Sequence, residues 1–339
     1  MNREKTILIT GCAGFIGNTV ALALLQRGDA VIGVDNMNDY YSIELKNARL
    51  KRIGLNKDFQ DFRIDICDKS KLIEVFENNK IDAVVHLAAQ AGVRYSLENP
   101  QAYIDCNITG TLNIFECCRN FGVKNIVLAS SSSVYGENAK IPFSVEDRTD
   151  NPVSLYAATK KSCELMAHTY SHLFSLNIAV LRYFTVYGPW GRPDMAPMIF
   201  AKSILEEKPI RIFGNGNMKR DFTYIDDIVN GTIAVLDWNM SKFTSKGISA
   251  KQTRCTEGGA MIFNIGCGKP VGLMRFVEIL ENELEKSAIK EFLPMQLGDV
   301  PATWADTAEL ESMVGYKPKV SLEEGVRLFA EWYKGYIGK

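Results

Sequence analysis

The sequence has no excess of basic residues. Its 339 residues include 39 lysines and arginines against 40 aspartates and glutamates, which gives a formal net charge of −1. A chain with this balance has no general attraction for nucleic acid or for an anionic membrane. We therefore expect no nucleic-acid partner, and we expect any bound phosphate to be held by a few individually placed arginine or lysine side chains.

Long apolar runs are also missing. No stretch reaches the roughly 20 apolar residues that a membrane-spanning helix requires, and the first apolar segment begins by residue 6, which leaves no room for a signal peptide. Hydrophobic residues still make up 46% of the chain, enough for an extensive core. These features predict a cytoplasmic globular protein without a membrane partner.

Metal-binding patterns are scarce as well. The chain has three histidines, and its eight cysteines include no C-x-x-C pair, so we interpret the cysteines as reduced thiols. His168 and His172 have a spacing that suits a metal on a helix. The glutamate of the metallohydrolase pattern does not accompany them, and we predict no metal site.

The start of the chain contains a strand, turn, helix and strand pattern. An apolar run at 5–10 predicts a buried strand, residues 19–28 predict a helix stopped by a glycine, and residues 30–35 predict a second strand. A glycine-rich turn separates the first strand from the helix. This order of elements is typical of dinucleotide-binding proteins.

The turn carries Gly11, Gly14 and Gly17, and Asp35 ends the second strand. Glycines at these positions let backbone N–H groups and a helix N-terminus face a pyrophosphate. The Asp35 carboxylate can accept hydrogen bonds from the adenosine ribose, and it would repel a 2′-phosphate. The sequence therefore predicts NAD, in preference to NADP, as the cofactor.

Strand and helix patterns continue to alternate beyond this unit. Further parallel strands are predicted at 59–65, 81–89, 124–130 and 176–184, with helices near 68–79, 101–121 and 156–174. The alternation predicts an α/β fold, with a Rossmann-type doubly wound parallel sheet and helices on both faces. Ligands of such sheets bind at the C-terminal ends of the strands.

After residue 184 the segments become shorter and richer in proline and glycine. We predict an NAD-binding Rossmann domain at 1–184 and a smaller mixed α/β portion at 185–339 that binds the substrate, with some of its elements returning to the sheet. The polar stretch 240–259 lacks periodicity and is predicted to be a surface loop.

Tyr156 and Lys160 form the pair of residues with the clearest chemistry. They are four positions apart in a predicted helix, so their side chains lie on one face. A free tyrosine has a pKa of about 10, and a neighbouring fixed positive charge favours the phenolate. The pair therefore indicates a general base that acts on an alcohol.

Motifs throughout the chain follow one family pattern. They are TGCAGFIG, GVDNMNDYY, HLAAQAGVRYSLENP, SSSSVYGE, YAATK, RYFTVYGPWGRPDMA, FGNGNMKRDFTYIDD and GDVPATWAD. With them the chain resembles the extended short-chain dehydrogenase/reductase family of nucleotide-sugar epimerases and dehydratases, and within it the UDP-glucuronate 4-epimerases most closely. The resemblance covers nearly the whole chain.

The resemblance implies an enzyme that interconverts UDP-glucuronate and UDP-galacturonate through a transient 4-keto sugar, with NAD as a retained cofactor. Tyr156 would take the proton of the 4-hydroxyl, Lys160 would hold the nicotinamide ribose, and Ser131 would hydrogen-bond the reacting oxygen. Two alternatives stay open. One is a 4-epimerase of a neutral UDP-sugar, such as UDP-glucose or UDP-N-acetylglucosamine, and the other is a non-catalytic NAD-binding relative.

The family pattern also implies a set of cofactor contacts, in the glycine turn, at the end of the second strand and at the ends of later strands. These residues are Gly11, Gly14, Phe15, Ile16, Gly17, Asp35, Asn36, Asp65, Ile66, Ala88, Ala89, Gln90, Asn107, Tyr156, Lys160 and Tyr183. It further implies a homodimer through the helices near 101–121 and 156–174, and a role in the supply of polysaccharide precursors.

The resemblance places the nucleotide end of the UDP-sugar at residues from both halves of the chain. Arg220 matches an arginine that contacts the diphosphate, and Arg211 and Phe213 resemble a uridine-binding strand. Asp299 matches a position near the uridine ribose or phosphate. Arg94 is expected to help close the phosphate or sugar site.

A glucuronate oxidised at C4 is a β-keto acid, which loses CO2 fastest when its C5–carboxylate bond is perpendicular to the carbonyl plane, so an epimerase must hold the carboxylate away from that alignment. We hypothesise that Ser132, Ser133 and Thr185 hydrogen-bond this carboxylate, with Arg192 nearby. The target of Arg192 could instead be a phosphate.

The serine run also separates this chain from related enzymes. Similar dehydratases carry an Asp-Glu pair at the positions of Ser132 and Ser133, and similar decarboxylases carry a glutamate at the second of them. The acids that those reactions need are missing here, which favours epimerisation. Which serine of the run contacts the reacting oxygen stays open.

Overall fold

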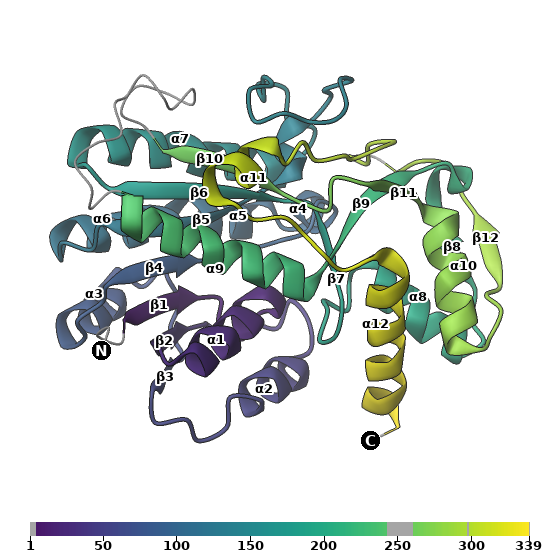
Figure 1. The fold of residues 1–339 in the computed structure, drawn as a ribbon, viewed down its shortest axis with the longest axis horizontal. Helices are drawn as coiled ribbons and strands as arrows, with labels where there is room; N and C mark the ends of the chain where they lie inside the picture. The colour runs from purple at the N-terminus through teal and green to yellow at the C-terminus, as the bar shows by residue number, and fades with distance from the viewer. Residues whose placement is uncertain (1–4, 243–259, 297, 339) are drawn as a thin grey trace.

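The computed structural model describes residues 5–242, 260–296 and 298–338. A seven-stranded parallel sheet of order β10-β6-β5-β4-β1-β2-β3 lies at its centre (Figure 1). Its strands are β1 (Thr6–Thr10), β2 (Ala30–Val34), β3 (Phe59–Phe62), β4 (Ala83–His86), β5 (Asn125–Ser131), β6 (Asn177–Tyr183) and β10 (Met261–Ile265). The strand order reverses between β1 and β4, as in a Rossmann sheet, so the predicted fold class is confirmed.

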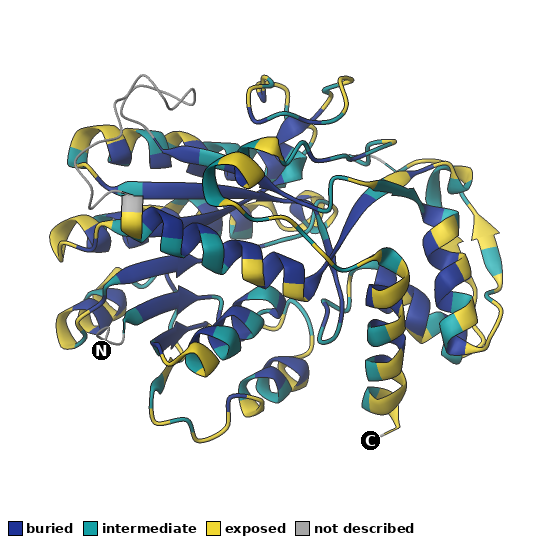
Figure 2. Ribbon diagram, in the orientation of Figure 1, coloured by how far each residue is buried: buried dark blue, intermediate teal, exposed yellow. Residues whose placement is uncertain are grey.

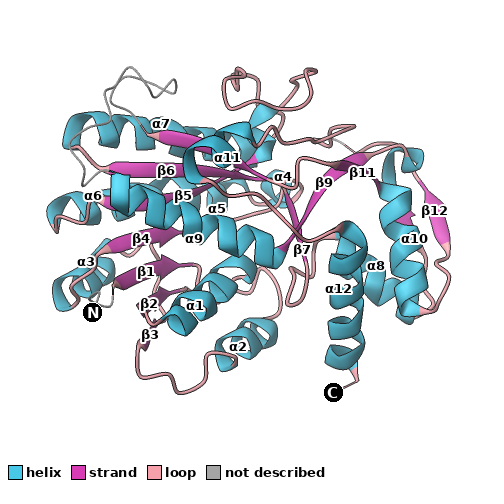
Figure 3. Ribbon diagram, in the orientation of Figure 1, coloured by secondary structure: helices cyan, strands magenta, loops and turns pink. Residues whose placement is uncertain are grey.

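Helices cover both faces of this sheet (Figure 3). On one face lie α1 (Phe15–Arg27) and α9 (Ile225–Lys242). On the other lie α3 (Lys69–Asn78), α6 (Thr111–Asn120) and α7 (Leu155–Phe174). The strands between the two layers are largely buried (Figure 2).

The core divides into two clusters because the side chains of a strand alternate between its faces. In β1, Ile7 and Ile9 belong to the cluster under α1 and α9, whereas Leu8 belongs to the opposite cluster, and all three are fully buried. Burial on both faces explains why the central strands have nearly continuous apolar sequences.

Short elements surround the C-terminal edge of the sheet. After β2 comes α2 (Ile43–Lys51), and between β4 and α6 come α4 (Tyr95–Glu98), α5 (Pro100–Tyr103) and the π-helix η1 (Ile104–Gly110). A 3-10 turn, η2 (Ser132–Tyr135), follows β5. These elements follow the C-terminal ends of the strands, where the candidate site lies.

The remaining elements form the smaller portion, on the right in Figure 1. A three-stranded sheet has the order β11-β9-β7, and β12 pairs with β8. The strands are β7 (Thr185–Tyr187), β8 (Ile210–Ile212), β9 (Lys219–Tyr224), β11 (Pro270–Gly272) and β12 (Lys290–Phe292). The helical segments of this portion are α8 (Ala196–Leu205), η3 (Phe213–Gly216), α10 (Leu273–Leu284) and α12 (Leu322–Ile337). The exception is α11 (Ala308–Val314), which lies beside β10 and α9 of the large sheet.

Several predicted boundaries were wrong, among them those of the strands predicted at 59–65 and 81–89, which are shorter in the structure. The first helix begins at Phe15, inside the glycine motif, because Gly14 already has the extended conformation of a helix cap. Its predicted end at Gly28 is confirmed, with φ of 96° and an N–H bonded to Leu24 and Leu25. In the predicted loop 240–259, residues 240–242 belong to α9, and 243–259 lie outside the described residues.

The division into residues 1–184 and 185–339 remains a prediction. The structure shows that the chain crosses this boundary more than once, because α9 packs on the large sheet and β10 pairs with β6 in parallel register. The seven described cysteines form no disulfide, and Cys255 lies outside the described residues. None of the described helices is both long and apolar enough to cross a membrane.

Candidate active site

The candidate site lies at the C-terminal edge of the large sheet, where the predicted residues come together. Ser131 ends β5 and is paired in register with Tyr183 at the end of β6. Ala88 follows β4, and the glycine turn follows β1. The carboxyl ends of four neighbouring strands therefore border one region of the surface, as expected for a ligand site in a doubly wound sheet.

The glycine turn packs so closely that larger residues would not fit. A Cβ atom on Gly11, which has φ of +75°, would lie 2.9 Å from the Ala88 nitrogen, and one on Gly17 would lie 2.1 Å from the Gly11 oxygen. Asp35 accepts hydrogen bonds from the backbone nitrogen of Ala13 at 3.1 Å and of Met37 at 2.9 Å. Close backbone packing and these hydrogen bonds thus hold the turn and the acid together as one unit.

The predicted adenine contacts also form one group. The Asn36 amide donates to Asp65 at 2.8 Å, and Asp65 accepts the Cys67 N–H at 2.8 Å. Ile66 is buried against Gly110. Phe15 is buried in the core, so its side chain is not available to a ligand, and Ile16 is partly buried beside it.

Asn107 supports the wall formed by Ala88, Ala89 and Gln90. Its amide accepts the Gln90 N–H at 2.8 Å and donates to the Gln90 carbonyl at 3.1 Å. It also donates to the Thr159 hydroxyl at 3.0 Å, which connects the wall to the helix of Lys160. A π-helix at this position suits a functional site, where such local distortions are frequent.

Tyr156 and Lys160 lie in the first turns of α7, which Ser154 caps by accepting the Ala157 N–H. Lys160 is 5% exposed, and its ammonium donates to the Ala129 carbonyl at 2.8 Å. Tyr156 is partly exposed, and its ring meets that of Tyr103 edge-on at 6.1 Å. The lysine is therefore fixed beneath a tyrosine that a ligand can reach.

The serine run forms its own small network at the end of β5. Ser131 is 9% exposed, donates to the Ser133 hydroxyl at 3.1 Å and accepts the Ser133 N–H at 3.2 Å. Ser132 is partly exposed. Thr185, at the start of β7, is also partly exposed.

Tyr183 is more deeply placed than the serines. Its hydroxyl bonds to Thr232 of α9 at 2.9 Å, and burial raises the pKa of its phenol. The side chain thus lies under the sheet end on the α1 and α9 side.

A buried ion pair behind the site was missed at the level of sequence. Arg182 of β6 donates twice to Glu164 of α7, both times at 2.8 Å, and Ser130 donates to the same carboxylate at 2.6 Å. Burial acts to raise the pKa of Glu164, but the hydrogen bonds and charge of Arg182 outweigh it, so the pKa is lowered. Glu164 follows Lys160 by one helical turn. This spacing could have indicated that the Glu164 carboxylate lies on the same face of α7 as Lys160.

Four predicted substrate residues converge from distant parts of the chain. Arg94 pairs with Asp299 at 3.4 Å and lies 5.0 Å from the centre of the Phe213 ring. Burial lowers the pKa of Arg220, and the nearby Asp299 partly opposes this. Arg211 is not part of the group, since its exposed side chain pairs with Glu291 of β12 at 3.6 Å.

Arg192 lies in the segment between β7 and α8. It donates to both carboxylate oxygens of Asp194, one of them at 3.0 Å. The Tyr40 hydroxyl donates to the same carboxylate at 3.0 Å. Burial, together with Asp194, raises the pKa of Tyr40 to about 12. Neither Tyr40 nor Asp194 was predicted, although both stand in the quoted motifs.

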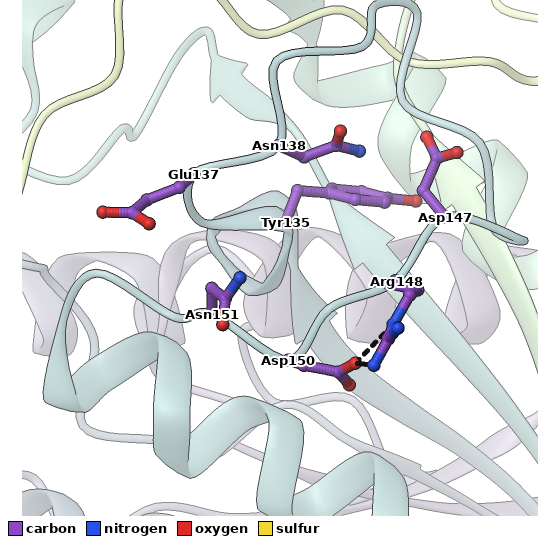
Figure 4. Close-up of a pocket in the computed structure, with 7 residues that line it drawn as sticks. All are labelled: Tyr135, Glu137, Asn138, Asp147, Arg148, Asp150 and Asn151. Atoms are coloured by element: carbon purple, nitrogen blue, oxygen red, sulfur yellow. Dashed lines mark hydrogen bonds and ion pairs between the residues drawn. The ribbon is translucent and has the colours of Figure 1, made fainter.

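Other features of the structure contain none of the predicted cofactor or substrate residues. A cavity of about 510 Å³ near the loop 137–151 has none of the predicted residues in its lining, and Figure 4 shows Asp150 paired with Arg148 there. His168 and His172 stack at 6.3 Å. Among the described residues, no group of three or more His, Cys, Asp or Glu side chains could hold a metal ion.

A family model described as NAD dependent epimerase/dehydratase family matches residues 7–247. The chain belongs to this family. Its members use NAD, so the predicted family and cofactor are confirmed.

Named relatives cover almost all of the chain. A UDP-glucuronate 4-epimerase of Thermodesulfobacterium geofontis is 48% identical over 331 residues, which are 97% of this chain and 96% of that protein. The structure of the Bacillus cereus UDP-glucuronic acid 4-epimerase with UDP-glucuronic acid and NAD has a TM-score of 0.85 and 37% identity, covering 98% and 99% of the two chains. A Thermotoga maritima UDP-glucose 4-epimerase with UDP-glucose has a TM-score of 0.83 and 30% identity, covering 98% and 99%. The predicted class, a nucleotide-sugar 4-epimerase, is confirmed.

Proposed function

We propose that this member of the family interconverts UDP-glucuronate and UDP-galacturonate by inversion at C4 of the sugar. The observation that best supports the acidic substrate is the position of Arg192, which lies next to Gly92 together with Tyr103, whose ring packs edge-on against Tyr156. Nε and one Nη of Arg192 bind Asp194, and the remaining N–H groups of the guanidinium can donate to a second carboxylate. A sugar acid therefore has a partner beside the reacting group, which a neutral sugar does not need.

The described residues fit NAD. The turn of Gly11, Gly14 and Gly17 has no space for side chains of its own and leaves its backbone open to a pyrophosphate. The Gln90 amide nitrogen is buried and has no partner among the described residues, so it is available to a ligand on that wall. When bound, NAD supplies a reversible acceptor for the hydrogen at C4 of the sugar.

In the proposed reaction the protein moves a single proton at the 4-oxygen of the sugar. The Tyr156 hydroxyl, as phenolate, takes this proton and later returns it. Lys160, held by the Ala129 carbonyl, keeps a positive charge beside the phenolate and binds the nicotinamide ribose. Ser131 donates a hydrogen bond to the reacting oxygen from the neighbouring strand end.

The sugar carboxylate must be controlled while C4 is oxidised. We propose that Ser132, Ser133, Thr185 and Arg192 keep its bond to C5 from turning perpendicular to the plane of the C4 carbonyl. Three hydroxyls and a guanidinium provide donors without any group that could act as the acid or base of an elimination. This composition favours epimerisation over loss of water or CO2.

The nucleotide end is assigned to the second group of residues. Arg94 and Arg220 provide the positive charge for the diphosphate, the Phe213 ring provides a surface for the uracil, and Asp299 provides an acceptor for the ribose. We assign Arg211 only a peripheral contact with the nucleotide, because its side chain pairs with Glu291.

We further propose a cytoplasmic homodimer that supplies precursors for polysaccharides. The support for the dimer is a row of exposed leucines on the two helices predicted to form it. Leu112 of α6 is 38% exposed, and Leu165 and Leu173 of α7 are 58% and 61% exposed. Two copies that pack these helices together would remove the leucines from water. Sedimentation of wild-type protein tests this, and a monomer would exclude it.

The decisive experiment is incubation with UDP-glucuronate and chromatography of the products, without added cofactor and then with NAD. UDP-galacturonate supports the proposal and excludes a non-catalytic NAD-binding relative. If only UDP-glucose or UDP-N-acetylglucosamine is epimerised, the enzyme is an epimerase of neutral sugars and the proposed role of Arg192 is wrong.

A further inference from the structure

Arg49, near the end of α2, is a buried cation that forms no ion pair within the described part of the chain. Its side chain is fully buried, and it forms no ion pair with any described residue, whereas the similarly buried Arg182 faces Glu164. Burial lowers the pKa of Arg49. Removing an unpaired charge from water costs free energy. The N–H donors of Arg49 therefore have a role that an apolar residue could not fill.

The guanidinium joins three segments at the edge of the site. Nη1 donates to the Ala13 carbonyl at 3.1 Å and to the Tyr41 hydroxyl at 2.7 Å. Nε and Nη2 donate to the Trp190 carbonyl at 3.0 and 2.7 Å, and Nη2 also donates to the Gly191 carbonyl at 3.0 Å. One side chain therefore holds the glycine turn, the segment after β2 and the segment before α8.

Trp190 needs such support because its backbone has an unfavourable conformation. Its φ is +66°, in the left-handed region that residues other than glycine seldom occupy. Its ring packs against Trp332 at 5.3 Å and Tyr336 at 5.7 Å, both in α12. The hydrogen bonds from Arg49 fix its carbonyl from the other side. This turn sets the direction in which the chain presents Arg192, two residues later.

We propose that Arg49 is a positioning residue that fixes the Arg192 segment against the NAD-binding turn. The backbone of Ala13 is held on both sides of its Cα atom, because its N–H donates to Asp35 and its carbonyl accepts from Arg49. The distance between the segment that binds the dinucleotide and the one that binds the sugar carboxylate is then set by a single guanidinium. This inference rests on the proposed function, which gives Arg192 its carboxylate.

Loss of this link has a specific chemical consequence. When the C5–C6 bond of the 4-keto sugar turns perpendicular to the plane of the C4 carbonyl, that bond breaks and CO2 leaves. The electron pair passes into the C4 carbonyl as an enolate, which takes a proton from water at C5 to give a 4-keto pentose. A displaced Arg192 segment therefore increases the decarboxylated product at the expense of the epimer.

The test compares Arg49→Lys with Arg52→Lys. Lysine keeps the charge but cannot reproduce the forked donors of arginine. Arg52 is a matched control, because it lies 5.1 Å from the Trp190 ring without binding the Trp190 carbonyl. We expect Arg49→Lys to raise the fraction of decarboxylated UDP-sugar about tenfold, since small misplacements of a reacting group have effects of this size or larger. Arg52→Lys should keep the wild-type fraction.

Two measurements separate positioning from general damage. The NAD content per subunit should stay at the wild-type level in Arg49→Lys. The extra thermal stabilisation that UDP-glucuronate gives over UDP should shrink, because only UDP-glucuronate has the carboxylate. An Arg49→Lys protein with wild-type product fractions and wild-type stabilisation by both ligands would overturn the positioning role alone. A wild-type protein without epimerase activity would overturn the proposed function instead.

Tyr41→Phe provides a second variant if Arg49→Lys does not fold. It removes one acceptor of Arg49 and leaves the contacts to the Trp190 segment in place. A rise of about two- to threefold in the decarboxylated fraction is expected from the loss of one hydrogen bond. An unchanged fraction in this variant would overturn the inference.

Discussion

The Lys160 ammonium donates a hydrogen bond of 2.8 Å to the Ala129 carbonyl of β5. This bond ties α7 to the sheet two residues before Ser131, the proposed partner of the reacting oxygen. Because Tyr156 lies one helical turn before Lys160, the same bond sets the height of the phenol above the strand end. The relative positions of base and serine are therefore a property of the sheet and α7, which are rigid elements.

Replacement of Tyr156 by phenylalanine tests the proposed base. The variant keeps the ring that packs edge-on against Tyr103 and loses only the hydroxyl. We expect kcat for UDP-glucuronate epimerisation to fall about a hundred- to ten-thousandfold, the usual contribution of a general base. The melting temperature and bound NAD should stay unchanged. Wild-type turnover in a folded, NAD-containing variant would exclude Tyr156 as the base.

Replacement of Arg192 by histidine tests the protection of the carboxylate. The variant loses the guanidinium that Asp194 orients, with the N–H groups that remain for the sugar, so the 4-keto sugar should lose CO2 more often. We expect the UDP-pentose fraction to rise about tenfold or more, measured by chromatography of the products. Arg275→His, at an exposed ion pair of α10, is the control. A normal epimer ratio without additional UDP-pentose would show that Arg192 has another role.

Local sequence patterns predicted much of this site for a physical reason. The glycine turn, Asp35, and the pair Tyr156 and Lys160 all depend on neighbours within a few residues, and the order of strands and helices follows from hydrophobic periodicity. The family, the fold and the class of enzyme were therefore predictable, and they are confirmed. The start of α1 was not, because Gly14 both caps the helix and belongs to the turn.

Local sequence patterns could not predict the contacts between distant segments. Arg94 meets Asp299, 205 positions away, and Arg49 meets Trp190, 141 positions away, because the chain returns to the sheet edge after long excursions. The exposed position of Arg211 could have been predicted from the sequence. In the sequence of β8 it stands between Ile210 and Ile212, which are both fully buried, so a strand must direct it to the other, exposed face.

Removal of one partner of the buried ion pair between Arg182 and Glu164 should strongly destabilise the folded protein. Arg182→Met leaves the Glu164 carboxylate buried without its main partner, so the free energy of unfolding in urea should fall by about 3–5 kcal/mol. Arg182→Met combined with Glu164→Met should lose less than the single variant, because no charge is left uncompensated. Arg327→Met, at an exposed pair of α12, should change little. Equal losses in the single and double variants would contradict this account.

His86 should make the protein less stable in acid. It is 1% exposed, and burial, with a smaller effect of Lys160, lowers its pKa to about 3. Thr10 accepts the N–H groups of Leu87 and Ala88, so its one proton must go to Nδ1 of His86, and the remaining ring proton lies on Nε2, toward Thr111. A second proton on the ring would break this network.

The direction of the pH effect follows from the difference between the pKa of His86 in the folded protein and its pKa in the unfolded chain. The ordinary pKa of histidine is 6.5, so the unfolded chain takes up a proton as the pH falls below that value, while folded His86 stays neutral until about pH 3. The free energy of unfolding should therefore decrease through this window, by about 1.4 kcal/mol per pH unit from this residue. His86→Gln should remove that part of the slope in urea unfolding measured from pH 7 to pH 4, and its curve should run parallel to wild type above pH 7. The same slope in both proteins would mean that other groups cause the acid sensitivity.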